Sequence, residues 1–192
     1  MRLRVVEEGY RLRERLILGL VRLMSGDAPD IMRTLFHRPA LFGRPLGAIT
    51  NRAMRQPGYW SVAERELFAA YVSQCNRCEF CIVCHGEYAS QAGDRHKVEQ
   101  ALRSGTDKEP RLDAALDFLA AFTAGPDMIE SSHLEALRRA CVPQAGIRDL
   151  AYIAFVFCVI NRVADALEFD VPPPAQFARS WRAMRGDRGY KV

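Results

Sequence analysis

The segment from 147 to 167, IRDLAYIAFVFCVINRVADAL, constrains the fold of this chain more than any other. Apolar side chains occur on nearly every face of the helix it would form, and such a helix is normally buried among other elements. Its longest apolar run, from Leu150 to Ile160, reaches about half of the roughly 20 residues that a membrane span needs. We therefore expect a central helix around which other helices pack.

The rest of the chain predicts helices and no strands. Apolar residues recur at helical spacing, and no segment with a two-residue period is bounded by turn residues, so the fold class is all-α. A length of 192 residues suits a single domain covering 1–192. We divide it into N-terminal helices over 1–58, a core over 59–170 and a C-terminal extension over 171–192, in which an exposed amphipathic segment follows three prolines.

Helix-starting and helix-breaking residues set the expected boundaries. Ser61 and Glu64 form a capping box for a helix that runs to about Gln74, and Asn76 is expected to start the next helix, which stops at Gly93. The other predicted helices cover 3–24, 29–37, 40–55 with an irregular middle at Pro45, 94–102 capped by Asp94, 110–124, 131–141 starting at Ser131 or Ser132, and 147–167.

Charge and hydropathy exclude several classes of protein. The formal charge of +4, from 27 basic and 23 acidic residues, is mild, and no basic stripe alternates with aromatic residues, so no nucleic-acid partner is expected. Acidic residues and Arg22 interrupt the apolar N-terminal stretch, and no cleavage site follows it, which argues against a signal peptide. We expect a cytoplasmic protein without a membrane partner. Leu16, Leu20 and Leu23 are predicted to pack on the core or on a second subunit.

Residues 64 to 85, ERELFAAYVSQCNRCEFCIVCH, hold four of the six cysteines and one of the four histidines. The four cysteines recur at every third position; they are Cys75, Cys78, Cys81 and Cys84. In a reducing compartment, clustered cysteines serve catalysis or metal binding more often than structural bridges. The remaining two, Cys141 and Cys158, are expected to pack inertly on apolar helix faces.

Three metal interpretations of the cluster meet specific objections. An iron–sulfur run of the ferredoxin type has three residues before its last cysteine and a proline after it, whereas Cys84 follows two residues and precedes His85. The run Cys81-Ile-Val-Cys84-His85 matches the attachment signature of c-type haem, but covalent haem attachment usually requires export. Zinc needs a second ligand pair, which the other histidines do not supply at regular spacing. We expect neither a metal nor a cofactor.

A reactive dithiol explains the cluster better. Cys78, Cys81 and His85 fall within one narrow stripe of a helix that turns about 100° per residue. His85 is four residues after Cys81 and can take the proton of its thiol. Cys78 lies near the helix N-terminus, where the helix dipole favours a thiolate. The two arguments point to different nucleophiles, and we prefer Cys81 because a specific base is adjacent to it.

The spacing of Glu66, Cys78, Cys81 and His85 resembles the motif of the alkylhydroperoxidase D-like members of the carboxymuconolactone decarboxylase superfamily. The flanking run ERELFAAYVSQCNRCEFC is similar to that family's motif region, and NRVADAL at 161–167 is similar to the end of its peroxidase-related branch. The specific match covers some forty residues. An all-α bundle of this type and a homo-oligomer, formed through apolar helix faces, are what the resemblance implies.

The resemblance also implies a thiol peroxidase. Glu66 and His85 would form a proton relay, Cys81 would attack a hydroperoxide to become a sulfenic acid, and Cys78 would close a disulfide that an external dithiol reduces. Phe80 stands where some members have histidine, and Cys75 and Cys84 are additional to the motif; Cys84 would be a second resolving thiol or a buried one. Two alternatives remain: a dithiol carrier or disulfide reductase serving a partner enzyme, and a non-enzymatic metal or redox sensor.

Overall fold

The computed structural model describes residues 8–25, 27–105, 109–185 and 189–190. Every regular element in these ranges is helical, which confirms the all-α prediction. The α-helices are α1 (Leu12–Ser25), α2 (Asp30–His37), α3 (Arg44–Arg55), α4 (Val62–Cys75), α5 (Glu79–Ala92), α6 (Arg95–Ser104), α7 (Pro110–Ala124), α8 (Ser131–Arg139), α9 (Gln144–Ala166) and α10 (Pro174–Met184). A π-helical turn, η2 (Pro39–Gly43), precedes α3, and a 3-10 turn, η3 (Pro126–Met128), follows α7.

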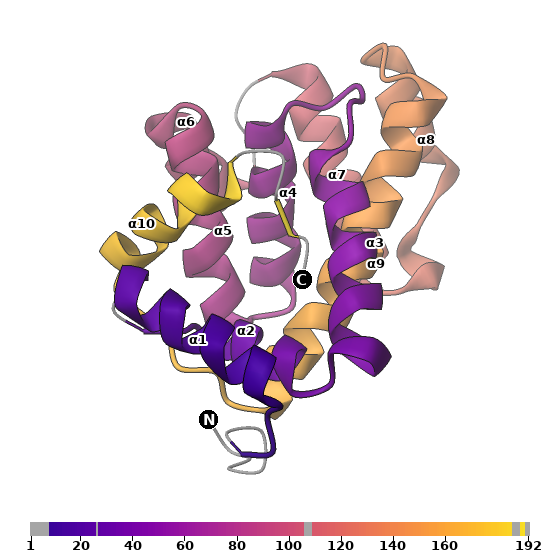
Figure 1. Ribbon diagram of the computed structural model, residues 1–192. Coiled ribbons are helices and arrows are strands. Elements are labelled where there is room, and N and C mark those ends of the chain that lie inside the picture. The colour runs from indigo at the N-terminus through magenta and orange to yellow at the C-terminus, as the bar shows by residue number, and fades with distance from the viewer. Residues whose placement is uncertain (1–7, 26, 106–108, 186–188, 191–192) are drawn as a thin grey trace.

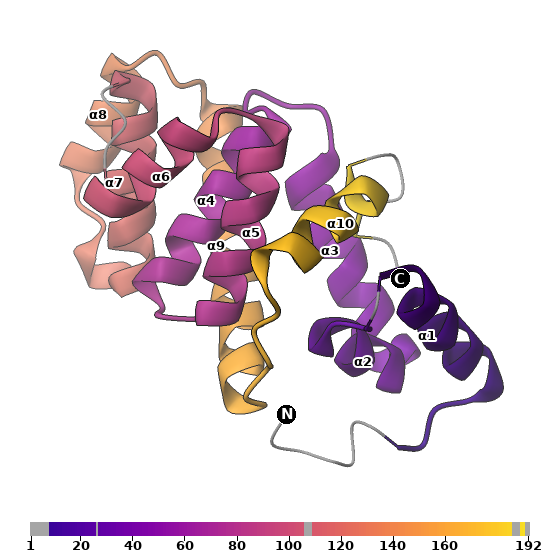
Figure 2. The same ribbon diagram turned by 90° about the vertical axis from the view of Figure 1, so that its left-hand side faces the viewer.

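Helices α4, α5 and α9 form the middle of the molecule. In Figure 2, α7 and α8 lie on one side of them, and α1, α2, α3 and α10 lie on the other. Helices α4 and α5 form an antiparallel hairpin, which places the two halves of the predicted motif against each other (Figure 1). None of the described helices has the length and hydropathy that crossing a membrane would require.

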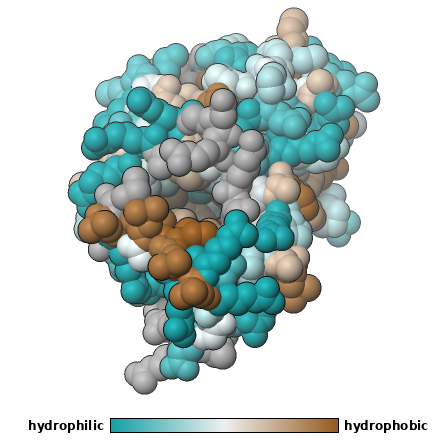
Figure 3. Space-filling model, viewed as in Figure 1, coloured by the Kyte–Doolittle hydropathy of each residue, from teal (hydrophilic) through white to brown (hydrophobic). Residues whose placement is uncertain are grey.

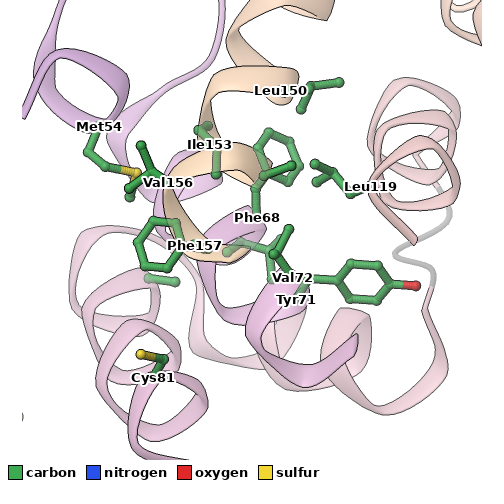
Figure 4. Packing of buried hydrophobic residues seen from close by; sticks show 14 of the residues in the cluster. Met54, Phe68, Tyr71, Val72, Cys81, Leu119, Leu150, Ile153, Val156 and Phe157 are labelled. Atoms are coloured by element: carbon green, nitrogen blue, oxygen red, sulfur yellow. The ribbon is translucent and has the colours of Figure 1, made fainter. Parts of the chain in front are cut away.

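The main hydrophobic core lies between α4, α7 and α9. Figure 4 shows Phe68 and Val72 of α4 beside Ile153 and Phe157 of α9, and all four side chains are inaccessible to solvent. Burying a side chain of this size stabilises the fold by about 1.5–3 kcal/mol. Helix α9 is therefore central, as predicted, but it is not buried on every side. A stripe of its apolar residues is exposed, namely Tyr152, Phe155 and Val159.

Local signals predicted most helix boundaries. Ser61 and Glu64 form the expected reciprocal capping box, and Asp94 accepts hydrogen bonds from the backbone at the start of α6. The helix expected over 40–55 has no irregular middle at Pro45, because a π-helical turn, η2, comes before it and Pro45 lies in the first turn of the regular helix α3, where its missing N–H costs nothing. Helix α8 begins differently, because Glu130 caps it in place of the predicted Ser131 or Ser132.

Helix α1 corrects the expectation for the N-terminal leucines. Residues 3–7 of the predicted helix lie outside the described ranges. The side chains of Leu16, Leu20 and Leu23 are 66%, 56% and 84% exposed, so they do not pack on the core of this chain. They form an apolar band over α1 in the space-filling view (Figure 3). Packing against a second subunit stays a prediction.

The C-terminal helix corrects a second expectation. The segment after the three prolines was predicted to be exposed, but α10 packs against α5 and buries two aromatic side chains. Phe177 is 1% exposed and Trp181 is 6% exposed. The ring of Phe177 makes an edge contact with Phe80 on α5. The end of α10 contacts α3, because Arg55 Nε donates to the Met184 carbonyl oxygen, and the Tyr190 hydroxyl contacts Glu66 on α4.

Candidate active site

The turn between α4 and α5 positions the two central cysteines. Arg77 adopts a left-handed conformation with φ of 62°, and the Cys78 N–H donates to the Ser73 carbonyl oxygen at 2.9 Å, which closes the end of α4. Cys78 then caps α5, so Cys81 lies in the first turn of that helix. Both cysteines are buried, with exposures of 0% and 1%.

Asn76 does not start α5, which corrects the predicted cap. It is the C-cap residue of α4, and its side-chain amide donates to Asn161 Oδ1 at 2.9 Å and to Cys158 Sγ at 3.6 Å. Asn161, buried on α9, in turn donates to Ser73 Oγ at 2.9 Å. This polar network joins the α4–α5 turn to the central helix.

Glu66 and His85 meet as the motif predicts. Glu66 extends from α4 and is fully buried, and its Oε2 lies 2.7 Å from Nδ1 of His85 on α5. A carboxylate accepts from Nδ1–H, which fixes the tautomer and leaves Nε2 as the basic nitrogen. His85 follows Cys81 by one helical turn on the same face of α5. The side chains of Cys81 and His85 also line the same cavity.

Two residues that the sequence analysis missed complete the surroundings of Glu66. The guanidinium of Arg55, on α3, donates to Glu66 Oε1 at 2.6 Å. The hydroxyl of Tyr190 donates to both carboxylate oxygens, at 2.8 and 3.1 Å. Neither residue belongs to a recognisable pattern, since Arg55 is one of many arginines and Tyr190 lies near the chain end. Only tertiary packing brings them to Glu66.

The charges around Glu66 keep its carboxylate ionised. Burial alone would raise the pKa of Glu66, but the hydrogen bonds and electrostatic attraction that His85 and Arg55 supply outweigh burial and lower that pKa. Arg55 is held over the rings of Tyr190 and Trp181, with centroid distances of 4.7 and 5.5 Å. Arg55 and Glu66 therefore form a buried ion pair of fixed geometry.

We expect stability to fall with acidity because of Glu66. A carboxyl whose pKa is lowered by folding stabilises the native state at pH values above its unfolded pKa, here about 4.5, and this contribution disappears as the pH falls through the lower folded value. Urea unfolding of the parent from pH 6 to pH 3 should show this loss. In Glu66→Gln that part of the pH dependence should be missing; a curve as steep as that of the parent would contradict the assignment.

Cys81 holds its proton tightly in the reduced protein. A hydrogen bond with Cys78 raises the pKa of the Cys81 thiol well above its ordinary value, and burial raises it further. A hydrogen bond with the Asn161 side chain acts in the opposite direction, because it stabilises the thiolate. Removing the proton of the Cys81 thiol would therefore require a base, and His85 lies one helical turn further along α5.

A cavity of about 310 Å³ lies against Cys81 and His85. Its walls are mostly apolar and come from α1, α2, α3, α5, α9 and α10. Cys81 lines this cavity, but Cys78 does not, so a small molecule in the cavity meets Cys81 first. The geometry of access thus agrees with the choice of Cys81 as the nucleophile.

The remaining cysteines occupy different environments. Cys84 also lines the cavity, and burial raises the pKa of its thiol, with the negative charge of Glu66 adding to the effect. Cys75 is exposed at the end of α4, and Cys158 is partly buried. Cys141 is exposed, so its predicted packing is wrong. Across the described ranges, histidine, cysteine, aspartate and glutamate side chains form no group of three or more that could hold a metal ion.

Comparisons with known proteins find structural neighbours only. No protein-family model and no curated protein matches the chain. A peroxidase-related protein from Silicibacter sp. TM1040 aligns with a TM-score of 0.78 and 24% identity, over 92% of this chain and 93% of its own. An alkylhydroperoxidase AhpD core protein from Ralstonia eutropha JMP134 aligns with a TM-score of 0.74 and 23% identity, over 100% of this chain and 95% of its own.

A third structural neighbour is named for a different activity, debromination. The debrominase Bmp8 aligns with a TM-score of 0.71 and 18% identity, over 88% of this chain and 91% of its own. A variant of that protein with a cysteine replaced by alanine was solved in complex with 2,3,4-tribromopyrrole. The three similarities show that this chain has the same helical fold as these proteins.

Proposed function

We propose that this chain, whose fold is that of the AhpD-like helical proteins, is a thiol-dependent peroxidase that reduces hydroperoxides with Cys78 and Cys81. The observation that carries the proposal is the buried contact of 2.7 Å between Glu66 and His85, one helical turn from a thiol that lines a cavity. A thiol that holds its proton, a base with a fixed tautomer and a second thiol in hydrogen-bond contact are the three parts such a reaction needs.

The reaction begins when His85 Nε2 takes the proton of the Cys81 thiol. The thiolate attacks one oxygen of the hydroperoxide, the O–O bond breaks, and the leaving alkoxide takes the proton from His85 to become an alcohol. Cys81 is then a sulfenic acid. The sulfur of Cys78 attacks the sulfur of Cys81, the hydroxyl group leaves as water with the proton of the Cys78 thiol, and a disulfide forms. An external dithiol reduces this disulfide by exchange and restores both thiols.

Burial favours this reaction over the alternatives from the sequence. The sulfur of Cys81 belongs to a side chain that is 1% exposed, which suits a small substrate better than exchange with the disulfide of a partner protein. A homo-oligomer stays part of the proposal, because the exposed leucines of α1 offer an apolar surface that a second copy would cover.

The test is peroxide consumption by the isolated protein, with cumene hydroperoxide as substrate and dithiothreitol as reductant. We expect turnover that depends on both reagents. Peptide mapping after one equivalent of peroxide should give a disulfide between Cys78 and Cys81, and Cys84→Ser should form it at nearly the parent rate. Finding both cysteines of the pair as unmodified thiols after the peroxide is consumed would overturn the mechanism.

Thiol-dependent dehalogenation is a second candidate, favoured by the apolar cavity that opens beside Cys81. In this reaction the two thiols would replace a carbon–bromine bond by a carbon–hydrogen bond, release bromide and end as the same disulfide. Bromide release from 2,3,4-tribromopyrrole, measured beside peroxide consumption, separates the two. Release of bromide without consumption of peroxide would favour this candidate over the peroxidase.

A further inference from the structure

Tyr190 is held in the site by its own backbone. Its N–H donates to the side-chain oxygen of Asn51 on α3, at 3.0 Å. Gly189, just before it, has a φ of +46°, and a Cβ atom there would collide with Asn51 and with Cγ of Arg55. Glycine therefore fits this position, and the close approach of Gly189 to α3 places Tyr190 against α3 and α4.

The side chain of Tyr190 contacts Glu66, Arg55 and His85. Its hydroxyl reaches both oxygens of Glu66, its ring lies 4.7 Å from the Arg55 guanidinium, and it stacks on the His85 ring with centroids 6.2 Å apart. The hydroxyl is also 3.4 Å from His85 Nδ1. These contacts place a residue from the end of the chain inside the relay.

The hydroxyl acts as a donor to a carboxylate that has no access to water. Burial raises the pKa of Tyr190 well above its ordinary value, and the negative charge of Glu66 raises it further, so the phenol stays protonated. A buried carboxylate offers about four acceptor positions. Arg55, His85 and Tyr190 supply the donors, and removing one leaves an unmatched lone pair on a fully buried anion.

We infer that Tyr190 is a positioning residue of the relay, whose hydroxyl holds the Glu66 carboxylate so that His85 keeps Nδ1–H on Glu66 and Nε2 toward the cavity. The inference rests on the proposed function for its catalytic consequence. It assigns a role to the C-terminal segment: the relay is complete only when Gly189 and Tyr190 are docked on α3.

Tyr190→Phe tests the inference, because phenylalanine keeps the ring contacts and removes only the hydroxyl. With one donor fewer on Glu66, the Glu66–His85 pair binds a proton more readily, so the midpoint of its titration moves up by about one pH unit. Ring signals of labelled histidine in NMR spectra measure this midpoint directly, and His85→Gln identifies the His85 signal. The acidic limb of the kcat/KM profile should move the same way, so that kcat/KM falls about tenfold at pH values below the midpoint of the parent.

Tyr152→Phe is the matched control, since Tyr152 is an exposed tyrosine of α9 outside the cavity. It should leave the titration and the rate unchanged. The NMR midpoint requires no turnover, so a parent protein that consumes no peroxide would refute the peroxidase while the titration still decides the role of Tyr190. An unchanged midpoint in Tyr190→Phe, or an equal shift in Tyr152→Phe, would overturn the inference.

Discussion

Replacing Cys81 with serine is expected to lower kcat/KM for hydroperoxide reduction by about three orders of magnitude or more. A serine hydroxyl is a far weaker nucleophile than a thiolate, so the variant loses its attacking group. Cys84 lines the cavity, but burial and the charge of Glu66 disfavour its thiolate. The measurement is peroxide consumption with dithiothreitol in excess.

Two comparisons make the result specific to Cys81. Cys141→Ser changes an exposed thiol that does not line the cavity and should retain the parent rate. Cys78→Ser should still react once, because Cys81 can reach the sulfenic acid, and a dimedone adduct on Cys81 should appear by mass spectrometry. A dimedone adduct on Cys78 in Cys81→Ser, with turnover preserved, would reverse the two roles.

Glu66→Gln is expected to lower kcat/KM by about 10² to 10⁴-fold. The neutral amide cannot stabilise a protonated His85, and its NH₂ group can donate to Nδ1, which places the proton on Nε2 and removes the base. The same change leaves the Arg55 guanidinium buried without its anion, and breaking a buried ion pair costs about 3–5 kcal/mol. Thermal unfolding and peroxide consumption measure the two effects.

A second variant separates the catalytic loss from the loss of stability. His85→Gln keeps the pair of Glu66 and Arg55 and removes only the base, so it should lose activity with a smaller loss of stability. Glu87→Gln is the matched control, because Glu87 is a buried carboxylate of α5 that pairs with Arg95 outside the cavity. Parent-like turnover in both Glu66→Gln and His85→Gln would exclude the relay.

Predictions from short-range patterns agreed with the structure where the partners lie on one helix or at one helix end. The capping box of Ser61 and Glu64 depends on three residues of local backbone, and Cys81 and His85 share a face because of helical periodicity. Asn76 shows the limit of this reasoning. Its sequence context indicates an N-cap, but its amide bonds across the core to Asn161, a contact that depends on how α4 and α9 pack.

The exposed surfaces departed from expectation for a similar reason. Helical periodicity identifies which residues of α1 share a stripe, yet it does not say whether that stripe faces the core. Leu16 and Leu20 point outward, whereas Phe177 and Trp181 of the supposedly exposed segment are buried against α5 and its neighbours. Whether an apolar stripe is buried depends on whether a neighbouring helix presents apolar surface against which it can pack.

The sequence by itself determined the all-helical class, the central place of α9 and the shared helix face of Cys81 and His85, because helix geometry converts spacing along the chain into proximity. Glu66 lies on a different helix, and only the resemblance to a known motif pointed to it. The tertiary structure alone decided that Arg55 and Tyr190 surround Glu66 and that Cys81 lines a cavity to which α10 contributes one wall. These contacts join residues 11 and 124 positions apart, and only the packing of whole helices brings such residues together.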